Sequence, residues 1–411
     1  FDKALSMASE SDDAASYAAI AKAATSPEDV EEALEAAEAA EQLAQSKGDS
    51  KAEACAAHTI ALLKFRLEDF EEALAAGQRS CGLFRELKLD HLEARARAGL
   101  ADAALRRRPP AEAEGKRFVD EAMDLAEGAL QTFERLDDSS GRALALDLKV
   151  RAWMARGDHA GAQEVLLQAL ESARGRSDKV VEAAALQSLV GVHLARKAVT
   201  AAIDCAQEAA KVQVTLGNQA AEAGAWHLAA QLLLKASNAP EALRCAQAAR
   251  RVHKGCSVSA AEEATVLQTL SAAHLANGDA AKALEVANAG RELCKQEAAE
   301  GGEALCALRV ASASLQLGDL EAALSSASDA QELFREVSDQ RAEASAAHLV
   351  ARIQLLRQDY SAARLAADTA RALLRQTCEL GREAGMLLLS SQAGSLELAA
   401  GSQPGGGKAA R

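Results

Sequence analysis

Residues 271–293 read SAAHLANGDAAKALEVANAGREL, and this stretch decides the fold. Gly278-Asp279 divides it into two halves, each with apolar positions three and four residues apart. Glycine readily adopts the left-handed conformation that ends a helix, and aspartate caps the start of the next one. Ala283 opens the second half, and Gly290 follows seven residues later, two turns along the same helix face. The stretch therefore predicts two helices joined by a tight turn.

The same pattern recurs along the chain. An Ala stands at the position of Ala283 in nine successive segments, spaced by 40 residues except for one step of 41 and one of 49. These anchor positions are Ala33, Ala73, Ala122, Ala162, Ala202, Ala242, Ala283, Ala323 and Ala363. The residue seven positions after each anchor is small, and twenty positions after it eight of nine residues are Glu. A 40-residue period with helical spacing inside it predicts a stacked array of helix pairs.

Each column of the repeat has a local explanation. Small residues at the anchor and seven positions later allow neighbouring helices to approach closely, and seven of nine residues ten positions after the anchor are aliphatic. The Glu column falls in the first turn of the next helix pair, where a carboxylate interacts favourably with the helix dipole. Ser50-x-x-Glu53 and Asp90-x-x-Glu93 have capping-box spacing. The columns thus predict both the helix contacts and the helix ends.

The composition limits the class of protein. Aromatic residues make up only 3% and Pro numbers 5, so the core is predicted to consist mainly of Ala and Leu packed between helices. No apolar stretch of about 18 residues is present, so no membrane insertion is expected. The net charge of −14 repels phosphate backbones and argues against nucleic acid as a partner. Eight cysteines without a Cys-x-x-Cys pair predict free thiols in a reducing intracellular compartment, cytoplasmic or organellar.

The turn, anchor and small-residue columns resemble the tetratricopeptide repeat over residues 14–400. Three departures from its common 34-residue form are the 40-residue period, the missing closing Pro and the replacement of aromatic residues by Ala or Leu. The longer period is similar to the repeats of Pins-type adaptors and, more distantly, of kinesin light chains. The resemblance implies an all-α, right-handed solenoid of about nine helix pairs plus a C-terminal capping helix. It also implies a non-catalytic module that binds a peptide or helix of a protein partner along its concave face.

The chain is predicted to hold one solenoid with irregular ends. Residues 1–13 are interpreted as the remnant of a preceding helix or cap, and residues 14–400 as a continuous array. One insertion near residues 105–117 accounts for the step of 49. The Gly-rich tail, residues 401–411, is expected to be flexible.

Two polar columns on the first helices are the candidate binding site, because first helices line the concave face in repeats of this kind. Four residues apart on one helix face, such side chains could hydrogen-bond a peptide or pair with its charges. A solvated inner wall is the alternative explanation. The candidate residues are His58, Asp147, Arg151, Gln187, His227, Gln231, Gln268, His348 and Arg352, with Asp102 joining them if the third pair is aligned on its first helix.

A basic cluster at the insertion is a second candidate. Arg106, Arg107 and Arg108 interrupt an acidic protein at this point, which suggests either a solvated loop or a docking point for an acidic partner surface. The histidines and cysteines lack the spacing of a zinc site. No phosphate-binding loop, nucleophile elbow or supported carboxylate pair is present either. No metal, cofactor or catalytic residue is therefore predicted.

Two functions from different classes remain open. In the first, the protein is an adaptor whose concave groove binds a peptide or helix of a protein partner. In the second, it is a permanent structural or accessory subunit of a large assembly, held by its convex face, edges and caps. A regulatory arm of a longer enzyme is a further alternative. The sequence does not identify the partner or the pathway.

Overall fold

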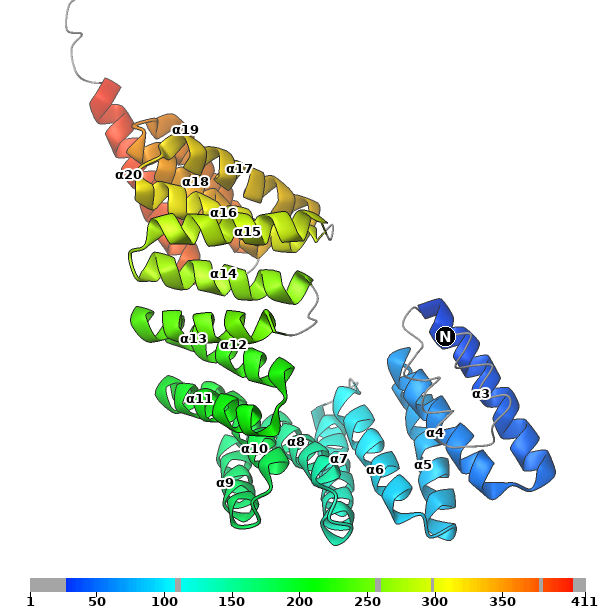
Figure 1. Ribbon diagram of the computed structural model, residues 1–411. Coiled ribbons are helices and arrows are strands. Elements are labelled where there is room, and N and C mark those ends of the chain that lie inside the picture. Colours follow the sequence, from blue (N-terminus) through cyan, green and yellow to red (C-terminus); the bar gives the residue numbers. More distant parts are fainter. Residues whose placement is uncertain (1–26, 108–111, 256–259, 297–298, 377–379, 402–411) are drawn as a thin grey trace, which may run out of the picture. The chain divides into compact units, whose positions relative to one another are not determined.

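The computed structural model describes residues 27–107, 112–255, 260–296, 299–376 and 380–401 (Figure 1). Within these ranges the structure consists of eighteen helices joined by short turns, and it contains no strand. The predicted all-α repeat fold is thus confirmed. None of the described helices has the length and apolarity needed to cross a membrane.

The helices fall into two compact units, residues 1–216 and 217–411, and each is described by itself. The helices of unit 1 are α3 (Pro27–Lys47), α4 (Ser50–Arg66), α5 (Phe70–Glu86), α6 (Asp90–Arg106), α7 (Glu112–Arg135), α8 (Ser139–Ala155), α9 (His159–Gly175), α10 (Lys179–Ala195) and α11 (Val199–Leu216). Those of unit 2 are α12 (Gln219–Lys235), α13 (Ala239–His253), α14 (Ala260–Ala276), α15 (Ala280–Gln296), α16 (Glu300–Leu317), α17 (Leu320–Glu336), α18 (Gln340–Leu356), α19 (Tyr360–Gln376) and α20 (Leu380–Gly401). The single continuous solenoid over residues 14–400 stays a prediction.

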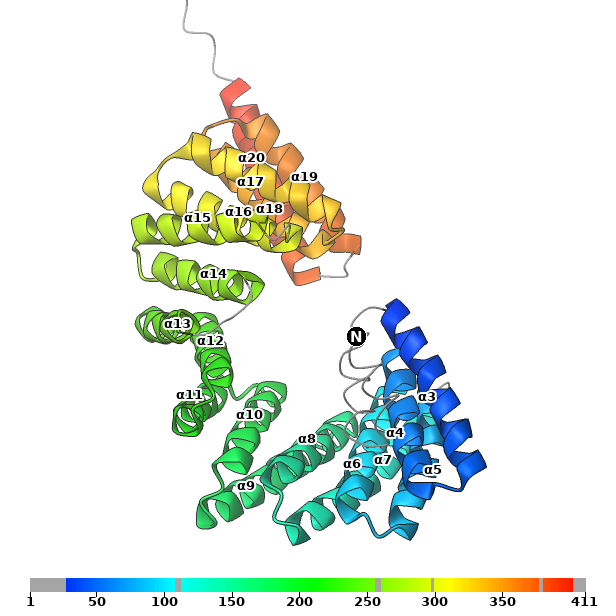
Figure 2. The same cartoon turned by 45° about the vertical axis from the view of Figure 1, so that its right-hand side comes forward.

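Each unit is a stack of helix pairs (Figures 1 and 2). Even-numbered helices are the first helices of the pairs, and odd-numbered helices carry the anchor Ala and are the second helices. Inside a unit each helix packs on the next along the chain, and successive first helices also meet, as α6 meets α8 and α14 meets α16. The insertion adds turns to α7, which has 24 residues where most of the other helices have 17. It leaves unit 1 uninterrupted, because α7 packs on both α6 and α8.

The core face of the second helices contains four columns of side chains. All nine anchor Ala residues are buried, and so are the residues four positions later, a column that the sequence interpretation missed. The buried residues four positions after the anchors are Ala37, Gly77, Ala126, Leu166, Ala206, Ala246, Ala287, Ala327 and Ala367. The nine residues eleven positions after the anchor are also buried, and the largest of them are Phe84, Phe133 and Phe334. At 100° per residue, offsets of four, seven and eleven all return close to the anchor direction.

The aliphatic column ten positions after the anchor is mostly only partly buried. Leu43 is 54% exposed, and Leu333 and Leu373 are half-buried. An offset of ten residues points about 80° away from the anchor direction, toward the edge of the core face. The column eleven positions after the anchor therefore fills the core instead.

The Glu column has a role that the sequence did not predict. The residues that cap α4 and α8 are Asp49 and Asp138, whose carboxylates accept backbone N–H groups of the first turn. The capping-box interpretation of Ser50 and Asp90 is wrong, because each stands one position inside its helix. The Glu carboxylates instead reach back across the turn to an arginine eight residues earlier. Such pairs are Arg85–Glu93 at 2.9 Å, Arg174–Glu182 at 3.1 Å and Arg335–Glu343 at 3.1 Å.

Most turns share one backbone geometry. The residue before the capping position has a positive φ, which is 68–84° at five Gly and 54–64° at eight other residues. A side chain in this left-handed region costs roughly 1–2 kcal/mol, and Gly avoids that cost at the expense of greater freedom in the unfolded chain. The repeat therefore tolerates a small strain at each non-Gly turn.

Glycine at such a turn should stabilise the protein. Ser177 has φ 56° and is exposed, so we expect Ser177→Gly to raise the free energy of unfolding by about 0.5–1 kcal/mol. Gly157 has φ 79° and open space around it, so Gly157→Ala should lower it by about 1 kcal/mol through the backbone alone. Urea denaturation of both variants measures these changes. If the free energy of unfolding moved in the same direction in both, the left-handed conformation assigned to these turns would be contradicted.

Candidate functional site

The predicted polar ladder lies on first helices of both units. Unit 1 has His58 on α4, Asp147 and Arg151 on α8, and Gln187 on α10. Unit 2 holds the remaining members, which are His227 and Gln231 on α12, Gln268 on α14, and His348 and Arg352 on α18. Gln187, Gln231 and Arg352 are exposed, and the other members are half-buried.

In unit 1 the ladder residues bind neighbouring first helices. Arg151 Nη1 on α8 lies 2.7 Å from Asp102 Oδ1 on α6. The hydroxyl of Ser188 on α10 donates a hydrogen bond of 3.3 Å to Asp147 on α8. The polar column therefore cross-links successive repeats, and Gln187 is its one exposed member in this unit.

His58 lies in a small apolar cavity of about 60 Å³ between α4, α5 and α6, whose lining also includes Asp102. Its ring meets Phe84 edge to face at 6.1 Å between centroids. Burial, and secondly the positive charge of Arg95, lowers the pKa of His58 to about 4. The imidazole is thus neutral at physiological pH and packs as part of the core.

The neutral form of His58 links stability to pH. The folded state holds its proton more weakly than the unfolded chain, whose pKa is about 6.5. The contribution of neutral His58 to the free energy of unfolding is complete above pH 6.5 and is lost as the pH falls toward 4. We expect the unfolding free energy of His58→Gln to decrease less over this pH range than that of the unmodified protein. Parallel urea titrations at pH 7.5, 5.5 and 4.5 measure the difference, and parallel curves would contradict the expectation.

In unit 2 the candidate residues are spread over helices with different surroundings. The Nε2 atoms of Gln231 and His227 lie 2.8 Å apart on α12. Burial, and secondly the nearby His253, lowers the pKa of His227. Gln268 on α14 donates a hydrogen bond of 3.2 Å to the backbone carbonyl of Gly302 on α16, and it therefore ties two first helices together.

The arginines at the insertion are already in contact with other parts of unit 1. Arg106 stacks over Phe65 at 4.9 Å and lies 3.5 Å from Asp102. Arg107 stacks over Phe118 at 3.9 Å and pairs with Glu71. Arg108 lies outside the described residues. These contacts hold the end of α6 against its neighbours.

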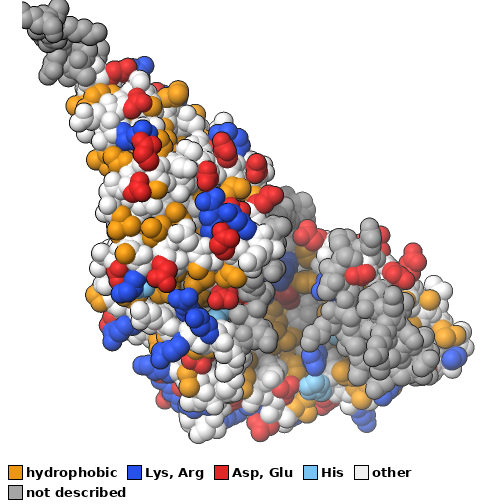
Figure 3. Space-filling view, turned by 45° about the horizontal axis from the view of Figure 1, so that its top comes forward, with side chains coloured by type: hydrophobic (Ala, Val, Ile, Leu, Met, Phe, Trp, Pro, Cys, Tyr) orange, Lys and Arg blue, Asp and Glu red, His pale blue; other side chains and the backbone are white. Residues whose placement is uncertain are grey.

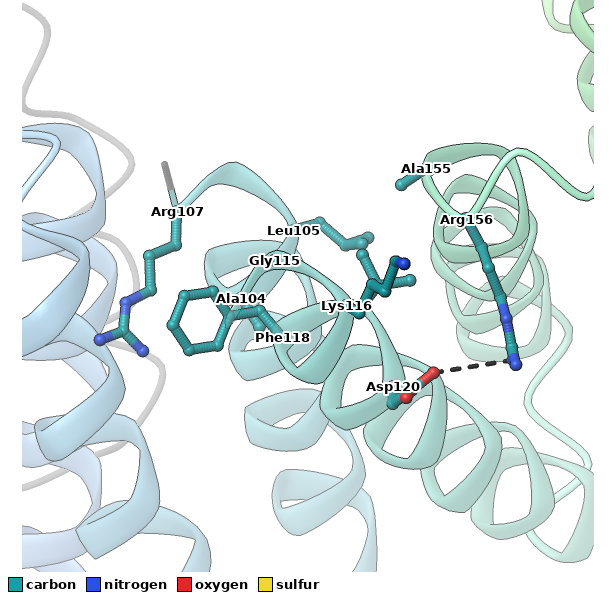
Figure 4. A pocket seen from close by; sticks show the side chains of 10 residues that line it. Ala104, Leu105, Arg107, Gly115, Lys116, Phe118, Asp120, Ala155 and Arg156 are labelled. Atoms are coloured by element: carbon teal, nitrogen blue, oxygen red, sulfur yellow. Dashed lines mark ion pairs between the residues drawn. The ribbon is translucent and has the colours of Figure 1, made fainter. Parts of the chain in front are cut away.

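A cavity of about 700 Å³ lies beside these arginines, between the end of α6, the start of α7 and the end of α8 (Figure 4). Leu105, Phe118 and Val119 give it apolar walls, and Arg107 and Lys116 add positive charge. At one side Arg156 pairs with Asp120 at 3.6 Å. The sequence pointed to this region through the arginines, but no spacing signal indicated that α8 would supply a wall.

Over much of the surface in the view of Figure 3, acidic and basic side chains of the described residues lie interspersed among apolar ones. Many of these charges form ion pairs between helices, as Arg291 does with Glu303 and Asp329, each at 3.1 Å. Among the described residues, no group of three or more His, Cys, Asp or Glu side chains is placed to hold a metal ion.

Comparisons with known proteins give structural similarity without sequence similarity. No protein-family model matches the chain, and no curated protein matches it. The apo form of RapI is similar with a TM-score of 0.52 and 12% identity, covering 69% of this chain and 77% of that one. A signal-transduction ATPase with a tetratricopeptide repeat sensor, PH0952 from Pyrococcus horikoshii, also gives a TM-score of 0.52, with 15% identity and 79% of this chain covered. The match spans 54% of that protein.

At these identities the comparisons bear on the fold alone. The closer similarity to Pins-type adaptors stays a prediction. The 40-residue period, the left-handed turns, the buried small-residue columns and the structural similarities agree with one another. The chain has the fold of a tetratricopeptide-like helical repeat protein.

Proposed function

We propose that the protein is a non-catalytic interaction scaffold that binds a peptide or helix of a protein partner along its first-helix faces. The observation that supports this most is the recurrence of polar side chains at two positions of the first helices, four residues apart, where Gln187, Gln231 and Arg352 remain exposed. Within one unit, a peptide that runs across the first helices meets such positions in turn. The repeats of PH0952 are described as a sensor, and a recognition role here is compatible with that use of the fold.

The His227–Gln231 pair on α12 is the best-defined part of this surface. The Gln231 amide is exposed and offers both a donor and an acceptor, while the His227 ring beside it fixes its position at 2.8 Å. A neutral imidazole, favoured by the lowered pKa of His227, holds the Gln231 amide without adding charge to this surface. Such groups suit the amides of a peptide backbone better than a charged ligand.

Replacing this pair tests the function. We expect His227→Ala/Gln231→Ala to weaken partner binding by about 1–3 kcal/mol for each buried hydrogen bond to the partner that the variant removes. Unfolding free energy should change by no more than about 0.5 kcal/mol, because the side chains do not fill the core. Gln268 is left unchanged in this variant, since its hydrogen bond to Gly302 is structural. Partners are captured from native extract by the unmodified protein and quantified by mass spectrometry against each variant.

The control variant is Arg106→Ala/Arg107→Ala, which leaves the ladder of unit 2 untouched. Loss of captured proteins in the His227/Gln231 variant but not in this control supports the proposal. The reverse result would favour the second candidate function, a structural subunit of a large assembly held by its edges, convex face and caps. The observation that keeps this second function open is the set of exposed leucines on the last helix, which include Leu388 at 74% exposure.

A further inference from the structure

Two buried thiols meet between α15 and α16, in the interior of unit 2. Cys294 on α15 is 2% exposed and Cys306 on α16 is fully buried, and both belong to one buried cluster with Ala264 of α14. A hydrogen bond joins the two thiol groups. The three helices contact one another in the stack (Figure 1). The structure therefore brings together two soft sulfur donors that lie twelve residues apart in the sequence.

The repeat explains why these two residues meet. A residue eleven positions after an anchor shares a buried cluster with the residue twelve positions further along, which lies on the next first helix. Such pairs are Phe84 and Ala96, Phe133 and Ala145, Phe334 and Ala346, and Leu374 and Met386. In the repeat of Ala283 the same two positions hold Cys294 and Cys306. The contact between the thiols thus belongs to the regular packing of the fold.

Two glycines make room for the sulfur atoms. A Cβ atom at Gly290 would lie 3.0 Å from Cys306 Sγ, and a Cβ atom at Gly302 would lie 2.8 Å from Cys294 Sγ. Gly290 is the only glycine in its column, because the other eight repeats have Ala or Ser there. Cys306 therefore has space beside α15 that a side chain occupies in the other repeats.

A positive charge lies beside the thiols. Arg309 stands one turn after Cys306 on α16, is half-buried, and interacts electrostatically with the Cys306 thiol. Among the residues that the structure describes, no carboxylate interacts with its guanidinium. Gln268 of α14 forms a hydrogen bond with Cys306. The residue equivalent to Arg309 is uncharged in each of the other described first helices, so this cation is specific to the repeat that holds the thiols.

These groups fit a soft metal ion that takes two thiolate ligands. Thiolates select soft cations, and among these Cu(I) is stable with two sulfur ligands in a linear arrangement. A structural Zn²⁺ ion needs four ligands, and within the described ranges no three His, Cys, Asp or Glu side chains gather around one point. Burial raises the pKa of both thiols, that of Cys306 to about 12, so the metal-free thiols are protonated at neutral pH.

We propose that Cys294 and Cys306 bind one Cu(I) ion between α15 and α16. Binding replaces two S–H bonds by two Cu–S bonds and releases two protons to solvent, so the complex of Cu⁺ with two thiolates carries one negative charge. Arg309 supplies the compensating positive charge. A disulfide between the thiols would be neutral and would leave the Arg309 guanidinium without a counter-ion. The site does not depend on the proposed peptide binding.

The test offers Cu(I), as its coloured bicinchoninate complex, to the reduced full chain without oxygen. Loss of the colour measures transfer of the metal to the protein. We expect Cys294→Ala and Cys306→Ala each to take up one equivalent of Cu(I) less than the unmodified protein. Alanine stands at the same two positions in other repeats, as Ala173 and Ala346 show, so both variants should fold.

Three further variants and a spectrum define the site. Cys81→Ala changes a buried thiol of unit 1 beside Arg97, and Cu(I) uptake should stay unchanged. Arg309→Met should weaken the affinity for Cu(I) at least tenfold, because the buried complex loses its counter-ion. Arg309→Lys keeps the charge and should retain more of the affinity. X-ray absorption at the copper edge should show two sulfur neighbours and no nitrogen or oxygen neighbour.

Thermal melting gives an independent readout. A ligand that binds only the folded state raises Tm, so Cu(I) should raise the Tm of the unmodified protein but not that of Cys306→Ala. A fall in Tm would show that the unfolded chain binds the metal, and it would overturn the proposal. Uptake that both Ala variants retain, a third ligand in the absorption spectrum, or an affinity that Arg309→Met leaves unchanged would also overturn it.

Discussion

Replacing Arg142 by methionine should destabilise the protein more than any other substitution considered. Arg142 stands at the first-turn position that Glu occupies in the other repeats, and its side chain is 8% exposed. Its guanidinium contacts Asp178 at 2.7 Å and Asp137 at 2.8 Å, and it donates a hydrogen bond of 3.1 Å to Ser139. The Asp178 carboxylate is equally buried, at 8% exposure. Arg142→Met therefore leaves a buried carboxylate without its cation, which costs about 3–5 kcal/mol.

A double-mutant cycle separates the ion pair from the packing of the arginine side chain. Asp178 also caps α10 by accepting the N–H of Val181, and Asn can perform the same capping. We expect Arg142→Met/Asp178→Asn to recover part of the stability, because the unpaired charge is gone and the cap remains. Arg244→Met, in an exposed pair with Glu241, is the control and should cost less than about 1 kcal/mol. Chemical denaturation of the unmodified protein, Arg142→Met, Asp178→Asn and the double variant completes the cycle. A cost of Arg142→Met equal to that of the Arg244→Met control would contradict the buried pair.

Protonation of Asp178 should make the stabilising effect of the Arg142–Asp178 pair depend on pH. Burial alone would raise the pKa of Asp178, but the hydrogen bonds from Arg142 and from the N–H of Val181 outweigh it and lower the pKa. A carboxyl with a lowered folded pKa stabilises the protein above its unfolded pKa and loses that contribution as the pH falls through the folded value. The difference in unfolding free energy between the unmodified protein and Arg142→Met should therefore become smaller in strong acid.

The second large effect is expected from Ala330→Leu. Ala330 is fully buried and contacts Ala304 and Ala307 of α16 and Ala346 of α18. Three helices meet at this point around small Ala side chains and the Phe334 ring, so the added atoms have no space without moving a helix. Overpacking of this kind costs about 1–3 kcal/mol. The free energy of unfolding from urea titration measures it.

Ala169→Leu is the matched control for Ala330→Leu. Ala169 stands at the same position of its repeat but is half-buried, and it borders a small cavity of about 70 Å³ beside Leu146 and Ala173. The larger side chain can enter that space, so the cost should be smaller than at Ala330. Equal costs would show that burial does not control the tolerance of this column.

The candidate site shows where reasoning from sequence was incomplete. The two polar columns were visible from their spacing, because residues four apart on a helix share a face. That Arg151 pairs with Asp102, and Ser188 with Asp147, depends on how closely α6, α8 and α10 pack. Those contacts join residues 41 and 49 positions apart, and no local pattern gives the distance between their helices.

The Glu column illustrates the same limit. A carboxylate in the first turn of a helix is favourable for a local reason, the helix dipole, and the sequence offered that reason alone. In the folded chain the carboxylate also meets an arginine from the preceding helix, as Glu182 meets Arg174 at 3.1 Å. A spacing of eight residues joins two partners only when a tight turn folds one helix back on the other. The turn geometry had to be known before the pair could be recognised.

The sequence by itself determined the helix pairs, their 40-residue period, the left-handed turns at Gly157, Gly278 and Gly318, and the small residues of the core face. These features depend on helix geometry and backbone sterics, which act over a few residues and repeat with the chain. Only the tertiary structure decided which polar side chains bind one another, why His58 stays neutral, and that the column eleven positions after the anchor fills the core. Each of these depends on which helix lies beside which, and in a repeat protein neighbouring helices are similar enough in sequence that packing alone distinguishes a covered face from an open one.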